Sequence, residues 1–311
     1  MQIWKQISTK LKEINRVILL LVVSHKGSSP GKQGFKMMVS EDGYIYGSIG
    51  GGRTEFELVE EARRLFFKDK ISPFFQNQIH RDEDEESSGM ICSGEQLVLF
   101  YPVKAEHIEI IESIINNKSG ILSIKNNSFN LNIQDNLDTD FHFQKNESVW
   151  EYKEKIDRKS HLYIIGGGHV GLATAKLFSM LDFHITIFES RTGINTFNEN
   201  NYADEKFIID YKDISDLIPE SEKTYILILT HGYNTDRDIL GKLLKKKYGY
   251  IGMLGSKSKV KQTFKTLQKL GYPAEMLSKV DAPIGIPIGS KTPEEIAVSI
   301  AAKIISLKNA K

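Results

Sequence analysis

The sequence has a single cysteine, almost no excess charge and no long apolar run, and each shortage excludes a class of protein. One cysteine, Cys92, cannot form an intrachain disulfide or a multi-cysteine zinc site, which agrees with a reducing compartment. A net charge of +1 favours neither nucleic acid nor a membrane surface as a partner. The apolar run at 17–23 is too short to span a bilayer, and residues 1–15 lack the layout of a secretory signal. We therefore expect a cytoplasmic protein.

The first 118 residues predict an α+β domain. Residues 1–15 have helical spacing, the β-branched run at 17–23 is typical of a buried strand, and residues 35–39 and 44–48 predict a hairpin. Three glycines at 50–52 then lead into a helix. We expect this helix to have one apolar face, formed by Phe56, Val59, Ala62 and Phe66. We also expect a capping box formed by Thr54 and Glu57.

Residues 119–159 differ in composition from the residues before them. They are rich in Asn, Asp and Lys, and their apolar positions alternate, as at Phe129, Leu131 and Ile133. We predict a β-rich bridging segment and linker here, with a turn at Asn126 and Asn127.

The stretch at 162–171, LYIIGGGHVG, organises the second domain. An apolar strand runs into a G-x-G-x-x-G turn at Gly166, Gly168 and Gly171, and a helix follows. Later apolar runs at 184–188, 207–209, 225–229 and 250–254 alternate with helical stretches, which is how a parallel sheet is built. We therefore predict an α/β protein whose residues 160–311 form a Rossmann-type domain. Its last helix is expected to begin with Thr292, Pro293 and Glu295 as the capping residues.

Three glycine turns, at 50–52, 166–171 and 285–289, each lead into an expected helix. The first turn of a helix has unpaired backbone N–H groups at the positive end of the helix dipole, which suits an anion or a phosphate. Glycines that only make tight connections are the alternative. Three such turns in one chain favour a phosphate-bearing ligand.

Several side chains near these turns are candidate ligand contacts. Glu189 ends a strand at the spacing expected for a ribose 2′-hydroxyl of NAD, whereas Arg191 could accept the 2′-phosphate of NADP, so the sequence leaves both cofactors open. His169 could contact phosphates or cap the helix, and capping is slightly favoured. His231 and Asp236 follow the strand at 225–229, where they could contact a ligand or, with Thr230, belong to a capped turn; contact is favoured more for His231.

Cys92 is the one soft ligand in the chain. Its thiolate could bind a thiophilic metal such as molybdenum or copper, or accept sulfur. A lone cysteine is more often a small buried apolar side chain, and residue chemistry alone favours that interpretation.

Seven motifs occur in an order that resembles the XdhC/CoxI family, the accessory factors of xanthine dehydrogenase and related molybdenum hydroxylases. The resemblance covers both domains and leaves out mainly residues 103–160. The motifs are GSSPGKQGFKMMV (27–39), GSIGGGRTE (47–55), MICSGE (90–95), IIGGGHVG (164–171), THGYNTD (230–236), YIGMLGSKSK (250–259) and APIGIPIGSKTPEEIAVSI (282–300).

The resemblance implies a cofactor chaperone rather than a catalyst. It would bind the molybdenum cofactor (molybdopterin), protect it while a terminal oxo ligand is exchanged for sulfur from a cysteine desulfurase, and deliver it to an apo xanthine dehydrogenase-type molybdoenzyme. The family is also expected to form homodimers. By position, its cofactor-handling loop corresponds to Ser48, Gly50, Gly51, Gly52, Arg53 and Cys92, the last being the implied metal ligand.

One position departs from the family. Where the family has Cys-Gly-Gly, Ser93 here follows Cys92, and a side chain there reduces backbone freedom beside the thiolate. Two other functions are kept as alternatives. One is an NAD- or NADP-dependent oxidoreductase that uses the turn at 166–171, Glu189 and His231. The other is a docking scaffold without a ligand.

Overall fold

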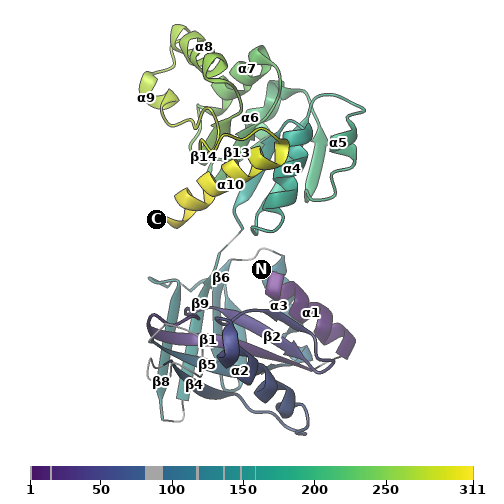
Figure 1. Ribbon diagram of the computed structural model, residues 1–311, viewed down its shortest axis with the longest axis vertical. Coiled ribbons are helices and arrows are strands. Elements are labelled where there is room, and N and C mark those ends of the chain that lie inside the picture. Colours follow the sequence, from purple (N-terminus) through teal and green to yellow (C-terminus); the bar gives the residue numbers. More distant parts are fainter. Residues whose placement is uncertain are drawn as a thin grey trace. The chain divides into compact units, whose positions relative to one another are not determined.

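The computed structural model describes residues 2–14, 16–80, 94–116, 119–135, 137–147, 149–157 and 159–310. The chain divides into two compact units, Met1–Arg158 and Lys159–Lys311, and each has its own sheets, helices and core (Figure 1). No helix in the described parts of the chain is both long and apolar enough to cross a membrane.

An antiparallel five-stranded sheet with the order β3-β2-β1-β5-β4 forms the base of the first unit. Its strands are β1 (Val17–Gly27), β2 (Lys36–Ser40), β3 (Ile45–Gly47), β4 (Phe74–His80) and β5 (Gly94–Val103). The central strand β1 contains the predicted apolar run, and every residue from 17 to 23 is buried. The odd-numbered residues of this run belong to one core and the even-numbered ones to another, so both faces of the sheet are covered.

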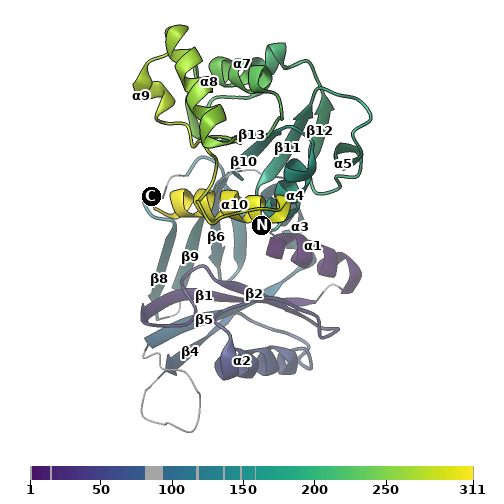
Figure 2. The same ribbon diagram turned by 45° about the horizontal axis from the view of Figure 1, so that its top comes forward.

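Helices cover the two faces of this sheet. Helix α1 (Gln2–Ile14), the short 3₁₀ turn η1 (Ala105–His107) and α3 (Ile108–Ile115) belong to one side, and α2 (Gly52–Leu65) covers the other (Figure 2). The leading helix was predicted from its spacing, and its Trp4, Ile7 and Leu11 are buried in the core of that side.

Helix α2 packs with a face that differs from the predicted one. Val59 and Ala62 are buried as expected, but Phe56 is 63% exposed, and Leu58 and Leu65 fill the core in its place. Positions 58, 62 and 65 have the i, i+4, i+7 spacing of a single helical stripe, so the apolar face is rotated relative to the prediction.

Residues 119–157 include a second antiparallel sheet, with the order β7-β6-β9-β8. Its strands are β6 (Gly120–Lys125), β7 (Ser128–Asn132), β8 (Phe141–Asn146) and β9 (Val149–Ile156). The predicted turn at Asn126 and Asn127 joins β6 to β7. Leu122 and Tyr152 lie in the same core as Leu19 of β1, so this sheet is packed against the first one within the first unit.

The second unit is a parallel five-stranded sheet, as predicted, with the order β12-β11-β10-β13-β14. Its strands are β10 (His161–Ile165), β11 (His184–Glu189), β12 (Glu205–Ile208), β13 (Ser221–Ile228) and β14 (Tyr248–Met253). The chain runs outward from β10 to β12 and then returns to β13, so the winding reverses between β10 and β13. The carboxyl edge at such a reversal is where open α/β sheets bind ligands.

Helices pack on both faces of the parallel sheet. One face is covered by α4 (His169–Phe178), α5 (Asn195–Asn198) and α10 (Pro293–Asn309). The other is covered by η2 (Tyr211–Asp213), α6 (Ile214–Leu217), α7 (Tyr233–Leu243), α8 (Lys257–Lys269) and α9 (Ala274–Leu277). The predicted start of α10 is confirmed: Thr292 Oγ1 accepts the N–H of Glu295, the Glu295 carboxylate accepts the N–H of Thr292, and Pro293 is the first helical residue.

Candidate functional site

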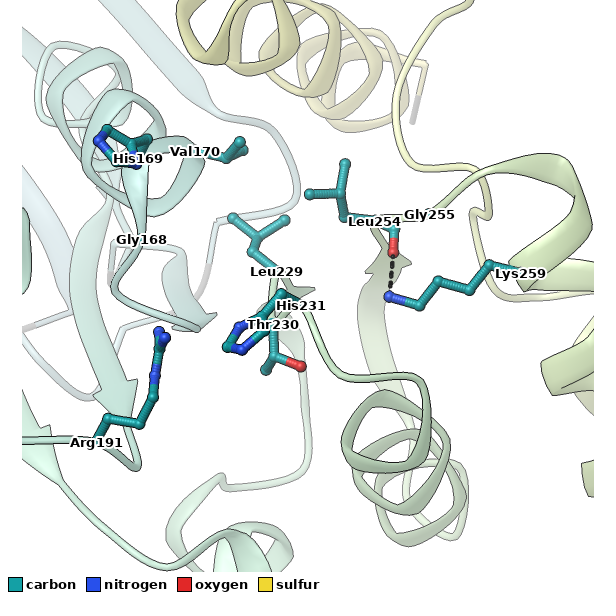
Figure 3. Close-up of a pocket in the computed structure, with 10 residues that line it drawn as sticks. All are labelled: Gly168, His169, Val170, Arg191, Leu229, Thr230, His231, Leu254, Gly255 and Lys259. Atoms are coloured by element: carbon teal, nitrogen blue, oxygen red, sulfur yellow. Dashed lines mark hydrogen bonds between the residues drawn. The ribbon is translucent and has the colours of Figure 1, made fainter. Parts of the chain in front are cut away.

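A pocket of about 500 Å³ lies at the carboxyl edge of the parallel sheet, next to the reversal of winding (Figure 3). This volume is within the range of small-molecule sites, roughly 300–1,000 Å³. Its walls come from the turns that follow β10, β11, β13 and β14. The lining residues are Gly168, His169, Val170, Arg191, Leu229, Thr230, His231, Leu254, Gly255 and Lys259.

The three glycines of the turn after β10 have different roles. Gly166 has φ +119°, and a Cβ there would lie 2.8 Å from the carbonyl oxygen of Leu229, so only glycine fits against β13. A Cβ on Gly171 would lie 2.3 Å from the carbonyl oxygen of Gly166, so this glycine lets α4 pack closely on the turn. A Cβ on Gly168 would meet nothing within 4 Å. Of the three, Gly168 is therefore the one whose backbone is open to a ligand.

Three helices begin beside this pocket. The N-cap of α4 is Gly168 and that of α7 is Gly232, and no side chain caps either helix. The N-cap of α8 is Ser256, whose hydroxyl accepts the N–H of Lys259. Two uncapped first turns leave backbone N–H groups available, and the positive ends of the helix dipoles favour a negatively charged ligand.

His169 and His231, both candidate contact residues, line the pocket and are exposed. His169 is the first residue of α4 and caps nothing, so the slightly favoured capping role was wrong. His231 follows β13, and in Figure 3 its ring and the guanidinium of Arg191 point toward one another. The turn after β10 and the turn after β13 thus bring together residues that are far apart in the sequence.

Glu189 ends β11 as predicted, but its carboxylate accepts hydrogen bonds from other groups of the same chain. The side chain is 1% exposed, and its two oxygens accept hydrogen bonds from the N–H groups of Gly167, Ser190 and Arg191 at 2.8–3.0 Å. The guanidinium of Arg191 adds two more, each of 3.0 Å. Burial alone would raise the pKa of Glu189, but these hydrogen bonds outweigh burial and lower the pKa to about 2. With five donors already present, the carboxylate has no free lone pair to offer a ribose hydroxyl.

The second carboxylate behind the pocket is also paired within the chain. Asp236, on α7, is fully buried and accepts hydrogen bonds from the Thr230 hydroxyl and the Lys259 ammonium. Burial raises the pKa of the Asp236 carboxyl, against the opposing effect of the two hydrogen bonds. The Lys259 ammonium also lies 3.5 Å from the carbonyl oxygen of Leu254, as drawn in Figure 3. Asp236 therefore holds Lys259 in place and does not line the pocket.

The lining of the pocket is consequently basic. It includes Arg191 and Lys259 and the two histidines, and none of its ten described residues is an acid. Sequence reasoning missed Lys259, although it lies in the motif YIGMLGSKSK. It is the third residue of α8, a position that gives no sign of the contact with Asp236. This arrangement suits an anion such as a phosphate.

In the first unit, a neighbouring carboxylate occupies two backbone donors of the glycine loop. Glu55 accepts the N–H groups of Ile49 and Gly51, at 2.8 and 3.0 Å, and the hydroxyl of Ser48 at 2.8 Å. The N-cap of α2 is Gly51, without a side-chain cap, so the predicted box of Thr54 and Glu57 was wrong. An anion could use these N–H groups only by displacing Glu55.

The other residues expected in this loop lie nearby. Gly50 has φ +131° and donates its N–H to the Ser48 hydroxyl, and Gly52 is the first residue of α2. The Arg53 side chain is 63% exposed and donates to Glu57. Cys92 and Ser93 lie outside the described residues.

A buried glutamine of β5 joins the loops that carry two of the sequence motifs. Gln96, 3% exposed, accepts the Ser29 hydroxyl and the Gly31 N–H, each at 2.9 Å, and donates to the carbonyl of Ile49 at 3.3 Å. These contacts connect the loop after β1, the glycine loop before α2 and the start of β5. Sequence reasoning did not single out Gln96, since its partners are 47 to 67 residues away.

Comparisons with known proteins find similarity in both units. The profile described as the XdhC Rossmann domain matches residues 162–304, and that of the XdhC and CoxI family matches residues 11–71. The uncharacterized protein YqeB of Escherichia coli is 25% identical over 309 residues, which are 97% of this chain but 46% of YqeB, so the chain spans about half of that relative. A Bacillus subtilis protein described as a probable xanthine dehydrogenase subunit is 23% identical over 96% of this chain and 95% of its own length.

A solved structure shares the fold over nearly the whole chain. It is a crystal structure described as a xanthine dehydrogenase from Bacillus halodurans, with a TM-score of 0.79 and 23% identity, covering 99% of this chain and 96% of that one.

Proposed function

The chain belongs to the XdhC and CoxI family, and on that premise we propose that it is an accessory protein for the maturation of a xanthine dehydrogenase-type molybdoenzyme. The similarity to the B. subtilis protein over nearly both full lengths supports a role connected with such an enzyme. In this role the chain binds the molybdenum cofactor, supports its sulfuration and delivers it to the apo-enzyme.

The observation that carries this proposal is the basic pocket of the second unit. The pterin of the molybdenum cofactor is anionic and bears a phosphate, so it requires oriented N–H donors and cations. The uncapped first turns of α4 and α7 offer backbone donors and the positive ends of two helix dipoles. Arg191 adds guanidinium donors beyond the two that it gives to Glu189. Arg191 and Lys259 are also the partners of Glu189 and Asp236, so the two ion pairs together carry no net charge, and they leave the pocket without a repelling acid.

An NAD-dependent oxidoreductase is less well supported than a cofactor chaperone. The residue at the ribose position, Glu189, is buried and has all its acceptor sites in use. An NADP-dependent enzyme fits somewhat better, because Arg191 is 44% exposed and two of its five donors are engaged with Glu189, so that others could contact a 2′-phosphate. A scaffold without a ligand would not require an open basic pocket.

The sulfuration part of the proposal concerns the first unit. We propose that Cys92 contacts the metal or its sulfur, and that the loop with Ser48 and Gly50–Gly52 opens toward the cofactor when Glu55 is displaced. A cysteine desulfurase as sulfur donor, a homodimeric state and a cytoplasmic location complete the proposal. Each of these is a prediction from the family resemblance.

The proposal is tested by what co-purifies with the chain. The chain should be purified from cells with and without molybdopterin synthesis, and the released pterin and nucleotide quantified. We expect close to one pterin per chain from the first cells and none from the second. Bound NADP without pterin would favour the oxidoreductase, and neither ligand would favour the scaffold.

The role of Cys92 is tested in the same preparation. Cys92→Ser should retain less pterin while the thermal unfolding curve stays unchanged, because a hydroxyl is a much poorer ligand than a thiolate for a thiophilic metal. Equal pterin content in the variant and the unaltered chain would remove Cys92 from the cofactor site.

A further inference from the structure

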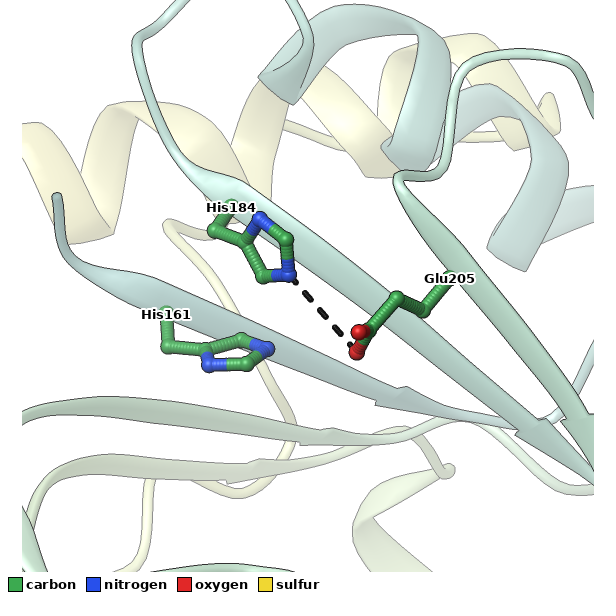
Figure 4. Close-up of side chains that lie close together, drawn as sticks. All are labelled: His161, His184 and Glu205. Carbon is green, nitrogen blue, oxygen red and sulfur yellow. Dashed lines mark ion pairs between the residues drawn. The ribbon is translucent and has the colours of Figure 1, made fainter. Parts of the chain in front are cut away.

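Two histidines and a glutamate come together at the amino edge of the parallel sheet, opposite to the edge that carries the pocket (Figure 4). His161, His184 and Glu205 are the first residues of β10, β11 and β12. One ligand atom from each lies within 4.8 Å of the corresponding atoms of the other two. None of these residues takes part in the basic pocket.

The register of the three strands explains why these side chains meet. His161 is paired directly with His184, and in the next pair of strands Thr186 is paired with Glu205. Side chains two residues apart on a strand share a face, so His184, Thr186 and Glu205 project from the same face as His161. The His161 ring stacks on Tyr163, with ring centroids 3.9 Å apart, and meets the His184 ring edge-on at 4.5 Å. These contacts fix the orientation of both imidazoles.

We propose that His161, His184 and Glu205 bind a divalent transition-metal ion, with Zn²⁺ as the best match. Imidazole nitrogens and carboxylate oxygens are ligands that zinc prefers, and a set of two histidines and one glutamate is typical of zinc sites with three protein ligands. Bond lengths of about 2.0–2.1 Å in a tetrahedron place neighbouring ligand atoms roughly 3.3 Å apart. His184 Nε2 and Glu205 Oε2 are already 3.6 Å apart.

The second nitrogen of His184 lies near a carboxylate, the kind of group to which metal-binding histidines usually donate a hydrogen bond. His184 Nδ1 lies 3.6 Å from a carboxylate oxygen of Asp204, and that same oxygen accepts the backbone N–H of Ile185 at 2.8 Å. The separation of Nδ1 from Asp204 is longer than a hydrogen bond, but a shift of about 0.5 Å would let Nδ1 donate to Asp204, and such a bond would direct the Nε2 lone pair toward the ion. The cluster therefore has a nearby carboxylate that can act as an outer partner, besides the three candidate ligands.

Thr186 connects two of the ligands directly. Its hydroxyl is buried, donates to Glu205 Oε2 at 2.9 Å and lies 2.8 Å from His161 Nε2. These bonds hold the His161 imidazole and the Glu205 carboxylate near one another. A metal ion bound there would replace the Thr186 hydroxyl as the partner of both groups. His161 would then carry its proton on Nδ1, which frees Nε2 to bind the ion.

The cluster can be reached from solvent. The side chains of His184 and Glu205 are 34% and 48% exposed. An ion can therefore enter, and water can fill a fourth position. Bound there, the ion would join the amino ends of three neighbouring strands and stabilise the sheet whose other edge forms the pocket.

Zinc binding to the full chain tests this site. The protein should be freed of metal with a chelator and titrated with Zn²⁺ by calorimetry, with Co²⁺ as a spectroscopic probe. All titrations should be done in the Cys92→Ser background, so that the thiol does not contribute. We expect one ion per chain and a rise in melting temperature on adding zinc.

Substitutions then assign the ligands. His184→Asn and Glu205→Gln should each weaken zinc binding about tenfold or more and reduce the rise in melting temperature. His142→Asn, which alters an exposed histidine of β8, should bind as the parent does. A folded parent that binds no zinc would overturn the proposal. So would zinc affinity and a cobalt spectrum that are unchanged in His184→Asn and Glu205→Gln, since the cluster would then be only a hydrogen-bonded network.

Discussion

At the scale of single residues, the carboxylate of Glu189 holds the glycine turn in place. It bonds the N–H of Gly167 from β11, and its pair with Arg191 orients the guanidinium at the edge of the pocket. The spacing from the glycine turn predicted an acid at the end of this strand. The spacing could not predict that hydrogen bonds within the chain fill the acceptor sites of this carboxylate. That outcome depends on the conformation of residues 189–191 and on the position of the Arg191 side chain.

A pH dependence follows from the lowered pKa of Glu189. Its pKa of about 2 in the folded chain lies below the ordinary value of 4.5, so its contribution to stability is complete above pH about 4.5 and is lost as the pH falls toward 2. A difference of this size corresponds to a stabilisation on the order of 3 kcal/mol. Urea unfolding at several pH values should therefore show wild type more stable than Glu189→Gln at pH 6, with the difference shrinking toward pH 2.5.

An exposed carboxylate provides the control for that experiment. Glu199→Gln should differ little from wild type at any pH, because Glu199 lies at the surface. A difference between wild type and Glu189→Gln that stays constant with pH would contradict the lowered pKa.

At the scale of elements, the turns and helix starts decide where a ligand can bind. The strand, glycine turn and helix at 162–171 were predictable, since apolar runs and glycine spacing are local signals. The apolar face of α2 was predicted incorrectly at Phe56, and the donors of the loop at 50–52 were expected to be open. The first error arises from tertiary packing, which decides which stripe of α2 is buried. The second is a local one, because Glu55 lies only four to seven residues after the groups that it bonds.

The ion pair of Asp236 and Lys259 joins α7 to α8 and gives a prediction about these elements. Lys259→Met leaves a fully buried carboxylate without its cation, so the chain should lose about 3–5 kcal/mol of stability. Adding Asp236→Asn removes the buried charge and should restore much of this loss. Thermal unfolding of the full chain measures both variants. A single variant as stable as wild type, or a double variant no better than the single one, would contradict the structural role of the pair.

At the scale of the whole molecule, the sequence predicted the architecture of the second unit better than the composition of its pocket. The parallel sheet follows from alternating helices and strands with short connections, whereas its strand order was not predicted. The order of the motifs indicated the family, which the comparisons confirm. The pocket was predicted only in part. Its cation Lys259 comes from a helix start about 90 residues beyond the glycine turn, and no local pattern links the two.

The central claim is that the basic pocket of the second unit holds the anionic pterin cofactor. Its most direct test is equilibrium binding of isolated molybdenum cofactor, under anaerobic conditions, to the full chain and to Gly168→Val. Gly168 has φ −73° and open space at its Cβ position, so valine is accommodated at a cost of about 1 kcal/mol at the N-cap while it fills the mouth of the pocket. Met180→Val, on the exposed turn after the same helix, is the matched control.

The account predicts binding of about one cofactor per chain to wild type and to Met180→Val, and binding at least roughly tenfold weaker to Gly168→Val, which corresponds to about 1.4 kcal/mol. Equally tight binding to a folded Gly168→Val would contradict it.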